Sequence, residues 1–332
     1  MGTLFNFMNP FREGDEPEGV RGEQGPGLRM RRSLGTRFPE VNPLADLTLT
    51  FHRTLRIPED GRDWPLPAGL GQFPIVEVQD LGAGAPRHWK EQGGVAIPMY
   101  QSEAMWISFV SHIGYPFAVK VLAGGIDAVS GEDWQKGLRS DPRNYLTVPE
   151  QPWLDGFCVE KGKVRQFVAA RLGEGRTVEE RLTGRAETGG LQIVVTPMKA
   201  DVWERLRRER DARADQRYGG LHYCAESTPE MGLGAGGSIR QEVYEDPHGL
   251  DVWDQTATRS CFVRIVQAQR WKDLTGHPVP HPPISRDAYL TAGIPWFEYF
   301  DPDLRVVHGG ERFAQLAGLD DAPLSGGWEE EG

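Results

Sequence analysis

Short stretches of alternating apolar and polar residues are the most regular feature of this chain. In residues 48–57 (TLTFHRTLRI), the pattern places Leu49, Phe51 and Arg53 on one face and His52 on the other. Residues 238–244 (SIRQEVY) alternate in the same way. A period of two is typical of a strand with one buried face. Apolar runs at 117–122, 191–196 and 261–266 predict further strands.

Turn-forming residues separate these predicted strands. The 332 residues include 41 glycines and 25 prolines, which favours closely spaced turns over long helices. Residues 199–217 predict a helix, because strong helix formers and opposite charges recur there three or four positions apart. We therefore predict a β-rich α+β fold, in which short antiparallel strands build a sandwich or barrel-like body with a few short helices.

A glycine-rich stretch, MGLGAGG at 231–237, precedes the alternating residues 238–244. Phosphate-binding glycine loops follow a strand, open a helix and carry further signature residues such as a Lys-Ser/Thr pair. Here the glycines precede a predicted strand, and no such lysine is present. We therefore predict a structural loop that leads into the strand.

Two segments of the chain resemble each other. Residues 163–168 read KVRQFV and residues 238–243 read SIRQEV, and each is followed by an apolar strand and a tryptophan-bearing segment. Pseudo-repeats at 163–206 and 238–274 would explain the similarity, although such short matches also arise by chance. If the duplication is real, Arg165 and Arg240 occupy equivalent places and are candidate ligand contacts.

The domain organisation we predict is a single body with extensions at both ends. Residues 1–42 lack apolar periodicity and are expected to form a flexible arm, and residues 316–332 an acidic tail. Between them, residues 43–315 form one β-rich body, in which a charged helix and a glycine-rich connection occupy 199–237.

The net charge and the cysteine positions exclude some kinds of partner and site. The net charge of −11 argues against nucleic acid as a partner. Cys158, Cys224 and Cys261 lack the spacing of a disulfide framework or zinc site, which favours a reducing compartment. No apolar run is long enough to span a membrane, and no secretory signal is visible. We therefore expect a cytoplasmic protein with no metal and no cofactor.

The residues most suited to catalysis or ligand binding are carboxylates and aromatic residues. Glu103, Asp155 and Asp251 are candidate acid or base residues, since glycan hydrolysis uses two carboxyl groups roughly 5–10 Å apart. Aromatic side chains line many sites for sugar or amide ligands. The candidate ligand contacts of this type are Tyr100, Trp106, Trp153 and Trp253. These residues also have explanations that require no binding site. The aromatic residues can pack in the core, and Asp155-Gly156 can form a hairpin turn.

Lys120 interrupts an apolar run at 117–122, which leaves two interpretations. Alternation gives the lysine a solvated face of the strand. If the side chain is buried instead, its pKa falls and it becomes the best candidate for a nucleophile or base.

Several motifs together resemble a family of uncharacterised bacterial and fungal proteins, some of which are labelled "integral membrane protein". The resemblance rests on PMYQSEA (98–104), QPWLDG (151–156), RQFVA (165–169), MGLGAGG (231–237), YEDPHGLDVWD (244–254) and GIPWF (293–297). It covers roughly residues 50–300. It implies no activity and assigns no catalytic residue.

Two functions are compatible with these features. The first is a non-catalytic protein that binds a protein partner or self-assembles, which we favour because no acid–base–nucleophile set is evident. The alternative is a hydrolase that acts on a glycan or amide substrate in an aromatic-lined cleft, with two of the three candidate carboxylates as acid and base.

Overall fold

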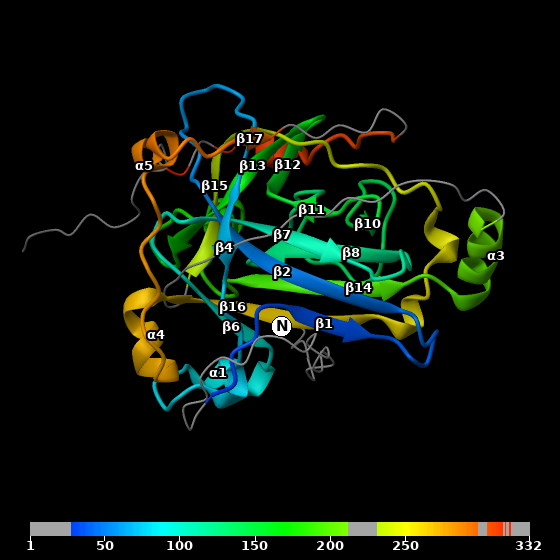
Figure 1. Cartoon of the computed structure of the whole chain (residues 1–332), viewed down its shortest axis with the longest axis horizontal. Coiled ribbons are helices and arrows are strands. Elements are labelled where there is room, and N and C mark those ends of the chain that lie inside the picture. Colours follow the sequence, from blue (N-terminus) through cyan, green and yellow to red (C-terminus); the bar gives the residue numbers. More distant parts are fainter. Residues whose placement is uncertain (1–27, 212–230, 298–303, 315, 317–318, 320–332) are drawn as a thin grey trace, which may run out of the picture.

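The computed structural model describes residues 28–211, 231–297, 304–314, 316 and 319. Within these residues the chain is strand-rich, and its strands form one large sheet and a small two-stranded one (Figure 1). Most of the arm predicted at 1–42, the connection at 212–230, Cys224 and nearly all of the predicted tail lie outside the described residues. The predicted β-rich α+β fold class is confirmed.

The large sheet has one main path of strands. Its order is β1 (Leu34–Arg37), β2 (Asp46–Thr54), β7 (Ala104–Val110), β13 (Lys163–Arg171), β15 (Met231–Arg240), β16 (Arg259–Gln267), β14 (Leu191–Pro197), β8 (Phe117–Ala123) and β10 (Leu146–Val148). Neighbours along this path pair antiparallel. The strand β6 (Val95–Met99) pairs with β16 in parallel.

Shorter strands extend the sheet at its sides. They are β4 (Gly69–Gln72) on β2, β5 (Val76–Glu77) on β6, β9 (Ile126–Asp127) on β8, β11 (Trp153–Leu154) on β7 and β12 (Gly156–Glu160) on β13. The two-stranded sheet joins β3 (Leu66–Pro67) to β17 (Trp296–Phe297).

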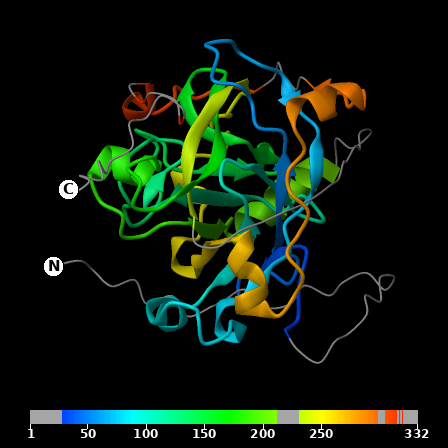
Figure 2. The same cartoon turned by 90° about the vertical axis from the view of Figure 1, so that its left-hand side faces the viewer.

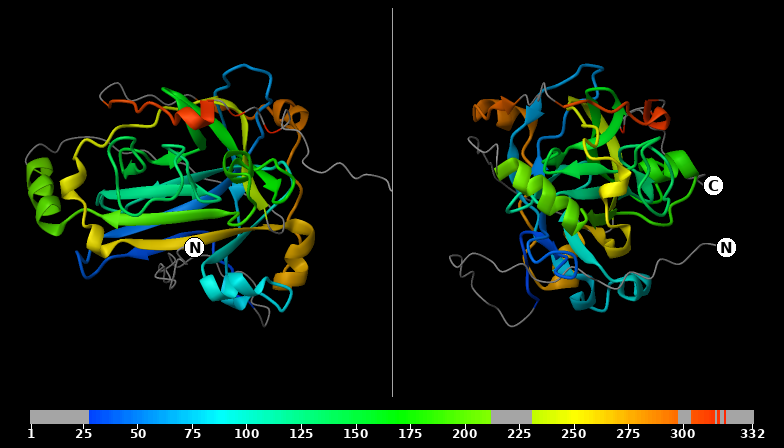
Figure 3. Two further views of the ribbon diagram at one scale, coloured as in Figure 1. Left: turned by 180° about the vertical axis from the view of Figure 1, so that it is seen from behind. Right: turned by 90° about the vertical axis from the view of Figure 1, so that its right-hand side faces the viewer.

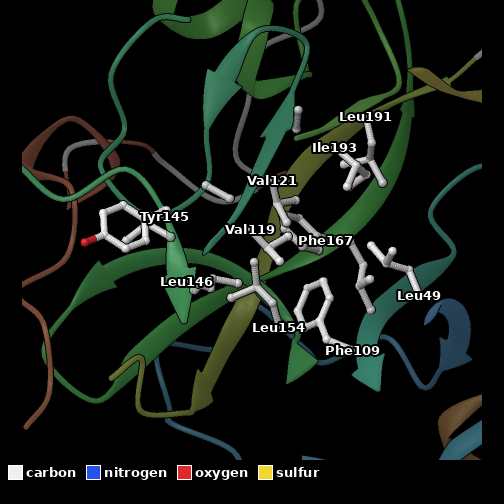
Figure 4. Packing of buried hydrophobic residues seen from close by; sticks show 14 of the residues in the cluster. Leu49, Phe109, Val119, Val121, Tyr145, Leu146, Leu154, Phe167, Leu191 and Ile193 are labelled. Carbon is white, nitrogen blue, oxygen red and sulfur yellow. The ribbon is translucent and has the colours of Figure 1, made fainter. Parts of the chain in front are cut away.

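The large sheet curls around one core. Leu49 of β2 lies near one end of the strand path and Val119 of β8 near the other, yet both belong to the same buried cluster. Figure 4 shows these side chains pointing toward one another, with Phe109, Phe167 and others between them. Strand twist makes such curling possible, and a shared core requires it. The body is therefore barrel-like.

The helices are short and lie outside the curled sheet. They are α1 (Arg87–Gln92), α2 (Val178–Thr183), α3 (Ala200–Asp211), α4 (Ala268–Thr275), α5 (Arg286–Thr291) and α6 (Glu311–Ala314). Figure 3 shows α3 at one end of the long strands β14 and β16 and α4 at the other. In Figure 2, α1 and α4 lie along the same edge, where Trp89 and Trp271 share a second buried cluster. The predicted helix at 199–217 is confirmed for the part that is described.

The strands predicted at 48–57, 117–122, 191–196 and 261–266 are confirmed as β2, β8, β14 and β16, although β2 ends at Thr54 and residues 55–57 lie outside it. The predicted arm at 1–42 is wrong at its C-terminal end. Residues 34–37 form β1, and Leu34 and Phe38 are fully buried in the core. The tail boundary also differs, since Leu316 packs against the same core.

The glycine-rich stretch is a strand rather than the predicted loop. Residues 231–240 form β15, and the alternating segment expected to continue to Tyr244 leaves the strand at Arg240. The glycines allow close approach on both sides of the sheet. A Cβ at Gly234 would lie 2.5 Å from Leu319 Cδ1, and one at Gly237 would lie 2.5 Å from the Pro58 carbonyl oxygen. Periodicity could not reveal this strand because glycine carries no side chain to alternate.

The two similar segments occupy different positions in their strands. KVRQFV begins β13, whereas SIR ends β15, and the two strands run antiparallel beside each other. In this register Arg165 lies opposite Ser238, and Arg240 lies opposite Lys163. The internal duplication stays a prediction. The first segment contains β13 and β14 and the second contains β15 and β16. In the sheet order β13-β15-β16-β14, the strands of the second segment lie between those of the first.

None of the helices in the described part of the chain combines the length and the apolar character that a bilayer crossing requires.

The close packing of β15 makes a testable prediction. In Gly237→Ala the new methyl would meet two backbone oxygens, of Pro58 and Ile57, at 2.5 and 2.7 Å. Backbone cannot move aside as a side chain can, so we expect a loss of roughly 1–3 kcal/mol in unfolding free energy, measured by urea denaturation. Gly84→Ala is the control, since its nearest neighbour is the side-chain tip of Leu274 at 3.2 Å. Equal stability of the two variants would contradict the packing argument.

Candidate functional site

A cleft of about 510 Å³ lies where the loop before β10 meets the segment before α6. These two segments are far apart in the sequence. The lining residues are Ser130, Glu132, Ser140, Asp141, Pro142, Arg143, Glu245, Val307, His308, Gly309, Gly310, Glu311 and Arg312. Charged and polar groups dominate this lining, and the volume is within the range of small-molecule sites.

Two glycines and an arginine join the walls of the cleft. A Cβ at Gly309 would clash with the backbone of Val159, and one at Gly310 with the carbonyl of Ser130. The Gly310 amide donates to the Cys158 carbonyl at 2.8 Å. Arg312 Nη1 donates to the Gly131 carbonyl at 2.9 Å and to Asp133 at 2.8 Å. The cleft is thus a product of close tertiary packing.

Arg143 supplies a hydrogen-bond donor to the wall of the cleft. Its guanidinium carbon lies 5.1 Å from the centre of the Tyr145 ring, which fixes the orientation of the group. Its Nη1 atom is buried and has no hydrogen-bond partner within the described part of the chain. A buried donor of this kind is costly unless something accepts from it.

A smaller cavity of about 10 Å³ adjoins the cleft. The two share Ser130, Glu132 and Pro142 in their linings. The inner cavity is also lined by Lys120, Asp127, Asp133, Gln135, Arg139 and Asn144. Its volume is roughly what one water-sized group requires.

Lys120 is buried, so the solvated interpretation of this residue is wrong. The residue is only 2% exposed, because the loop after β9 packs over the middle of β8. Nζ donates to the carbonyls of Gln135 at 2.7 Å and Gly137 at 3.1 Å, and lies 4.7 Å from the Trp134 ring centre. Burial lowers the pKa of Lys120, and the charge of Asp127 opposes this shift.

Asp127 is a buried acid beside Lys120 in the same cavity. Its Oδ1 accepts from the amides of Val129 and Ser130 at 3.0 and 2.9 Å and from the Ser130 hydroxyl at 3.1 Å. Its Oδ2 is buried, and none of the described residues forms a hydrogen bond with it. Burial raises the pKa of Asp127 to about 7, although the Ser130 amide and Lys120 lower it. The site therefore holds an acid that titrates near neutral pH.

A second network lies behind the cleft, built by the motif at 244–254. Asp246 Oδ2 accepts from the Tyr145 hydroxyl at 2.6 Å and from Trp253 Nε1 at 3.0 Å. Its Oδ1 accepts from the His248 amide at 2.7 Å. Burial and the bond to Asp246 raise the pKa of Tyr145 above its usual range. Figure 4 shows the Tyr145 hydroxyl pointing away from the core cluster.

His248 forms an ion pair at the edge of this network. Its Nε2 lies 3.5 Å from Glu150 Oε1. Burial lowers the pKa of His248, but the hydrogen bond to Glu150, the charge of Glu150 and that of Asp246 outweigh it. The pKa of His248 therefore lies above its ordinary value.

The predicted acid–base residues have separate hydrogen-bond partners. Glu103 is buried in an ion pair with Arg53 of β2, and its Oε2 accepts from the Tyr100 amide at 2.9 Å. Asp155 accepts from Gln241 Nε2 at 2.7 Å, and its own amide donates back to Gln241 at 3.0 Å. Asp251 is exposed in a short 3₁₀ turn.

The predicted ligand contacts are also distributed over several places. Trp106 stacks on His52 with ring centres 3.9 Å apart, and Trp153 donates a hydrogen bond to Asp155. The Tyr100 hydroxyl donates to the Pro280 carbonyl at 2.9 Å. None of the predicted site residues lines the cleft. Trp253 is linked to it through Asp246, whose neighbour Glu245 lines the cleft. Their roles as catalytic or ligand-binding residues stay predictions.

The cleft residues were missed because single charged residues in loops give no spacing signal. Asp127 is followed by a Ser-Gly turn, which is a common structural motif. Arg143 and Tyr145 lie in a polar loop that has no periodicity. Among the cavity residues, Lys120 was the one that the sequence singled out, since a lysine inside an apolar run is either solvated or deeply buried.

The chain matches no protein family model, and no curated protein or solved structure matches it either. In the described part of the chain, no three His, Cys, Asp or Glu side chains come together in a way that could hold a metal ion. The interpretation of the cleft therefore rests on its own chemistry.

The buried carboxyl of Asp155 predicts a pH-dependent stability. Burial raises its pKa to about 7, while hydrogen bonds from Gln241 and Trp153 lower it. A raised folded-state pKa gives stability that is full below the unfolded pKa near 4 and is lost as pH rises through 7. Relative to Asp155→Asn, the wild type should thus lose up to about 4 kcal/mol of unfolding free energy between pH 4 and pH 8.

Urea denaturation across this pH range measures the difference between the two proteins. Asp251→Asn is the control, since that side chain is exposed. A constant difference between wild type and Asp155→Asn at every pH would refute the assignment of a buried, proton-binding Asp155.

The ion pair of His248 with Glu150 should contribute to the stability of the fold only within a limited pH range. Because the folded-state pKa of His248 is raised, the pair stabilises the fold below the unfolded pKa of about 6.5 and loses this effect as pH rises through the folded value. His248→Gln should therefore cost about 1 kcal/mol or less near pH 6 and progressively less at higher pH. A double-mutant cycle with Glu150→Gln measures the coupling, and a coupling energy that is constant with pH would contradict the pair.

Proposed function

We propose that this protein is a non-catalytic binding protein that holds a small, negatively charged molecule in the cleft. The observation that carries the proposal is Arg143, which lines the cleft and whose buried Nη1 has no hydrogen-bond partner among the described residues. A guanidinium binds carboxylate and phosphate groups through two parallel hydrogen bonds. An anion at this atom would satisfy a donor that the protein alone leaves unpaired.

The other charges of the cleft favour a small ligand with localised charge. His308 and Arg312 lie on the same lining as Arg143, but four carboxylates, Glu132, Asp141, Glu245 and Glu311, lie there too. The acidic groups repel a ligand whose negative charge is spread over its whole length. A molecule with one anionic end beside Arg143 avoids that repulsion.

The cleft chemistry supports binding over catalysis. Among the described residues that line the cleft, neither Ser130 nor Ser140 is hydrogen-bonded to a histidine, as an activated serine would be. A hydrolase remains our second candidate. The specific observation in its favour is Asp127, an acid with pKa near 7 beside the cleft. The protein partner or self-association expected from the sequence stays a prediction.

Binding is testable with a panel of small anions. We expect at least one of acetate, hexanoate, gluconate or inorganic phosphate to raise the melting temperature of the wild type at millimolar concentration. Arg143→Gln should weaken the binding of that anion about tenfold or more in isothermal titration calorimetry, because the charge-assisted pair is lost.

Arg87→Gln is the matched control, since Arg87 lies on the surface of α1 and does not line the cleft. It should bind the anion as the wild type does. The proposal fails if no anion of the panel binds, or if Arg143→Gln binds as tightly as Arg87→Gln.

A further inference from the structure

The inner cavity has a second pair of groups with unused hydrogen-bonding capacity. Of the three protons on Lys120 Nζ, two are donated to the carbonyls of Gln135 and Gly137. Asp127 Oδ2 accepts no hydrogen bond from any residue that the structure describes, although Asp127 is only 1% exposed. One donor and one acceptor therefore belong to residues that line the inner cavity, and this cavity shares Ser130, Glu132 and Pro142 with the lining of the cleft.

A hydroxyl group satisfies both of these atoms at once. It can accept a proton from an ammonium and donate its own to a carboxylate, and it consists of a single heavy atom. An ammonium group in this place would lie against the positive charge of Lys120. A second carboxylate would lie against Asp127 and could not donate to it. The cavity volume of about 10 Å³ also admits little more than one heavy atom.

We infer that the cleft takes a hydroxylated anion, of the class of hydroxy acids and sugar acids. Its anionic end lies at Arg143, and a hydroxyl enters the inner cavity between Lys120 and Asp127. This inference rests on the proposed function and deepens it. Ser130, Gln135 and Asn144 also line the inner cavity and are polar, and the charged side chains of Glu132, Asp133 and Arg139 complete its lining together with Pro142.

The experiment compares acids that differ only in their hydroxyl groups. Glycerate is matched with propionate, and gluconate with hexanoate, in calorimetric titrations at pH 8, above the raised pKa of Asp127. In the wild type the hydroxylated member of at least one pair should bind about tenfold more tightly or better, since it satisfies two buried groups.

Asp127→Asn sharpens the test. The amide oxygen can still accept from the amides of Val129 and Ser130, but an N–H donor replaces the accepting Oδ2. We expect the ratio of the two affinities, hydroxylated acid over plain acid, to fall toward one. Asp251→Asn is the control and should keep the preference.

The outcomes separate this inference from the proposed function. If both members of each pair bind equally and both depend on Arg143, anion binding stands and the hydroxyl assignment is overturned. If Asp127→Asn keeps the full preference, the assignment is also overturned. If no acid binds in an Arg143-dependent way, the proposed function itself fails. The wild-type comparison decides the question even if Asp127→Asn does not fold.

Discussion

The close backbone packing of β15 is the constraint on which the rest of the structure depends. This strand connects the two halves of the sheet, since β13 and β7 lie on one side of it and β16, β14 and β8 on the other. Its glycines let Leu319 and the backbone at Pro58 approach to distances that a Cβ would forbid. Side chains here would hold the layers apart and open the curl of the sheet. The shared core of Figure 4 exists because this contact is tight.

The same principle assembles the cleft. Gly309 and Gly310 let the chain before α6 lie directly on Val159 and Ser130, and Arg312 then bonds to the loop that covers Lys120. Residues that approach the C-terminal end of the chain thus form one wall of a site whose other wall begins at Ser130. A cleft made by such packing is preorganised, so ligand binding does not require the walls to be ordered first.

The buried polar groups are of two kinds. Some are bonded to other groups of the protein, and others retain an atom that could bond to a ligand. Glu103 pairs with Arg53, and Asp155 pairs with Gln241. We call these pairs closed, because each buried group is bonded to another group of the protein and has a structural role. Asp246 is likewise closed by Tyr145, Trp253 and His248. Arg143 and Asp127 differ, since each lines a cavity and each retains a buried atom that has no partner among the residues described by the structure. That difference, rather than burial or a shifted pKa alone, distinguishes the candidate site from structural networks.

The sequence by itself determined the β-rich fold class, the strands at β2, β8, β14 and β16, and the helix at α3. Alternation and helix-forming composition are local properties, so they can be interpreted without knowledge of distant residues. It also identified Lys120 as a residue with two possible environments. Only the tertiary structure decided between them, because the loop that covers Lys120 is irregular. The strand β15 and the partners of Asp127 and Arg143 were decided in the same way, by contacts between segments that no local pattern connects.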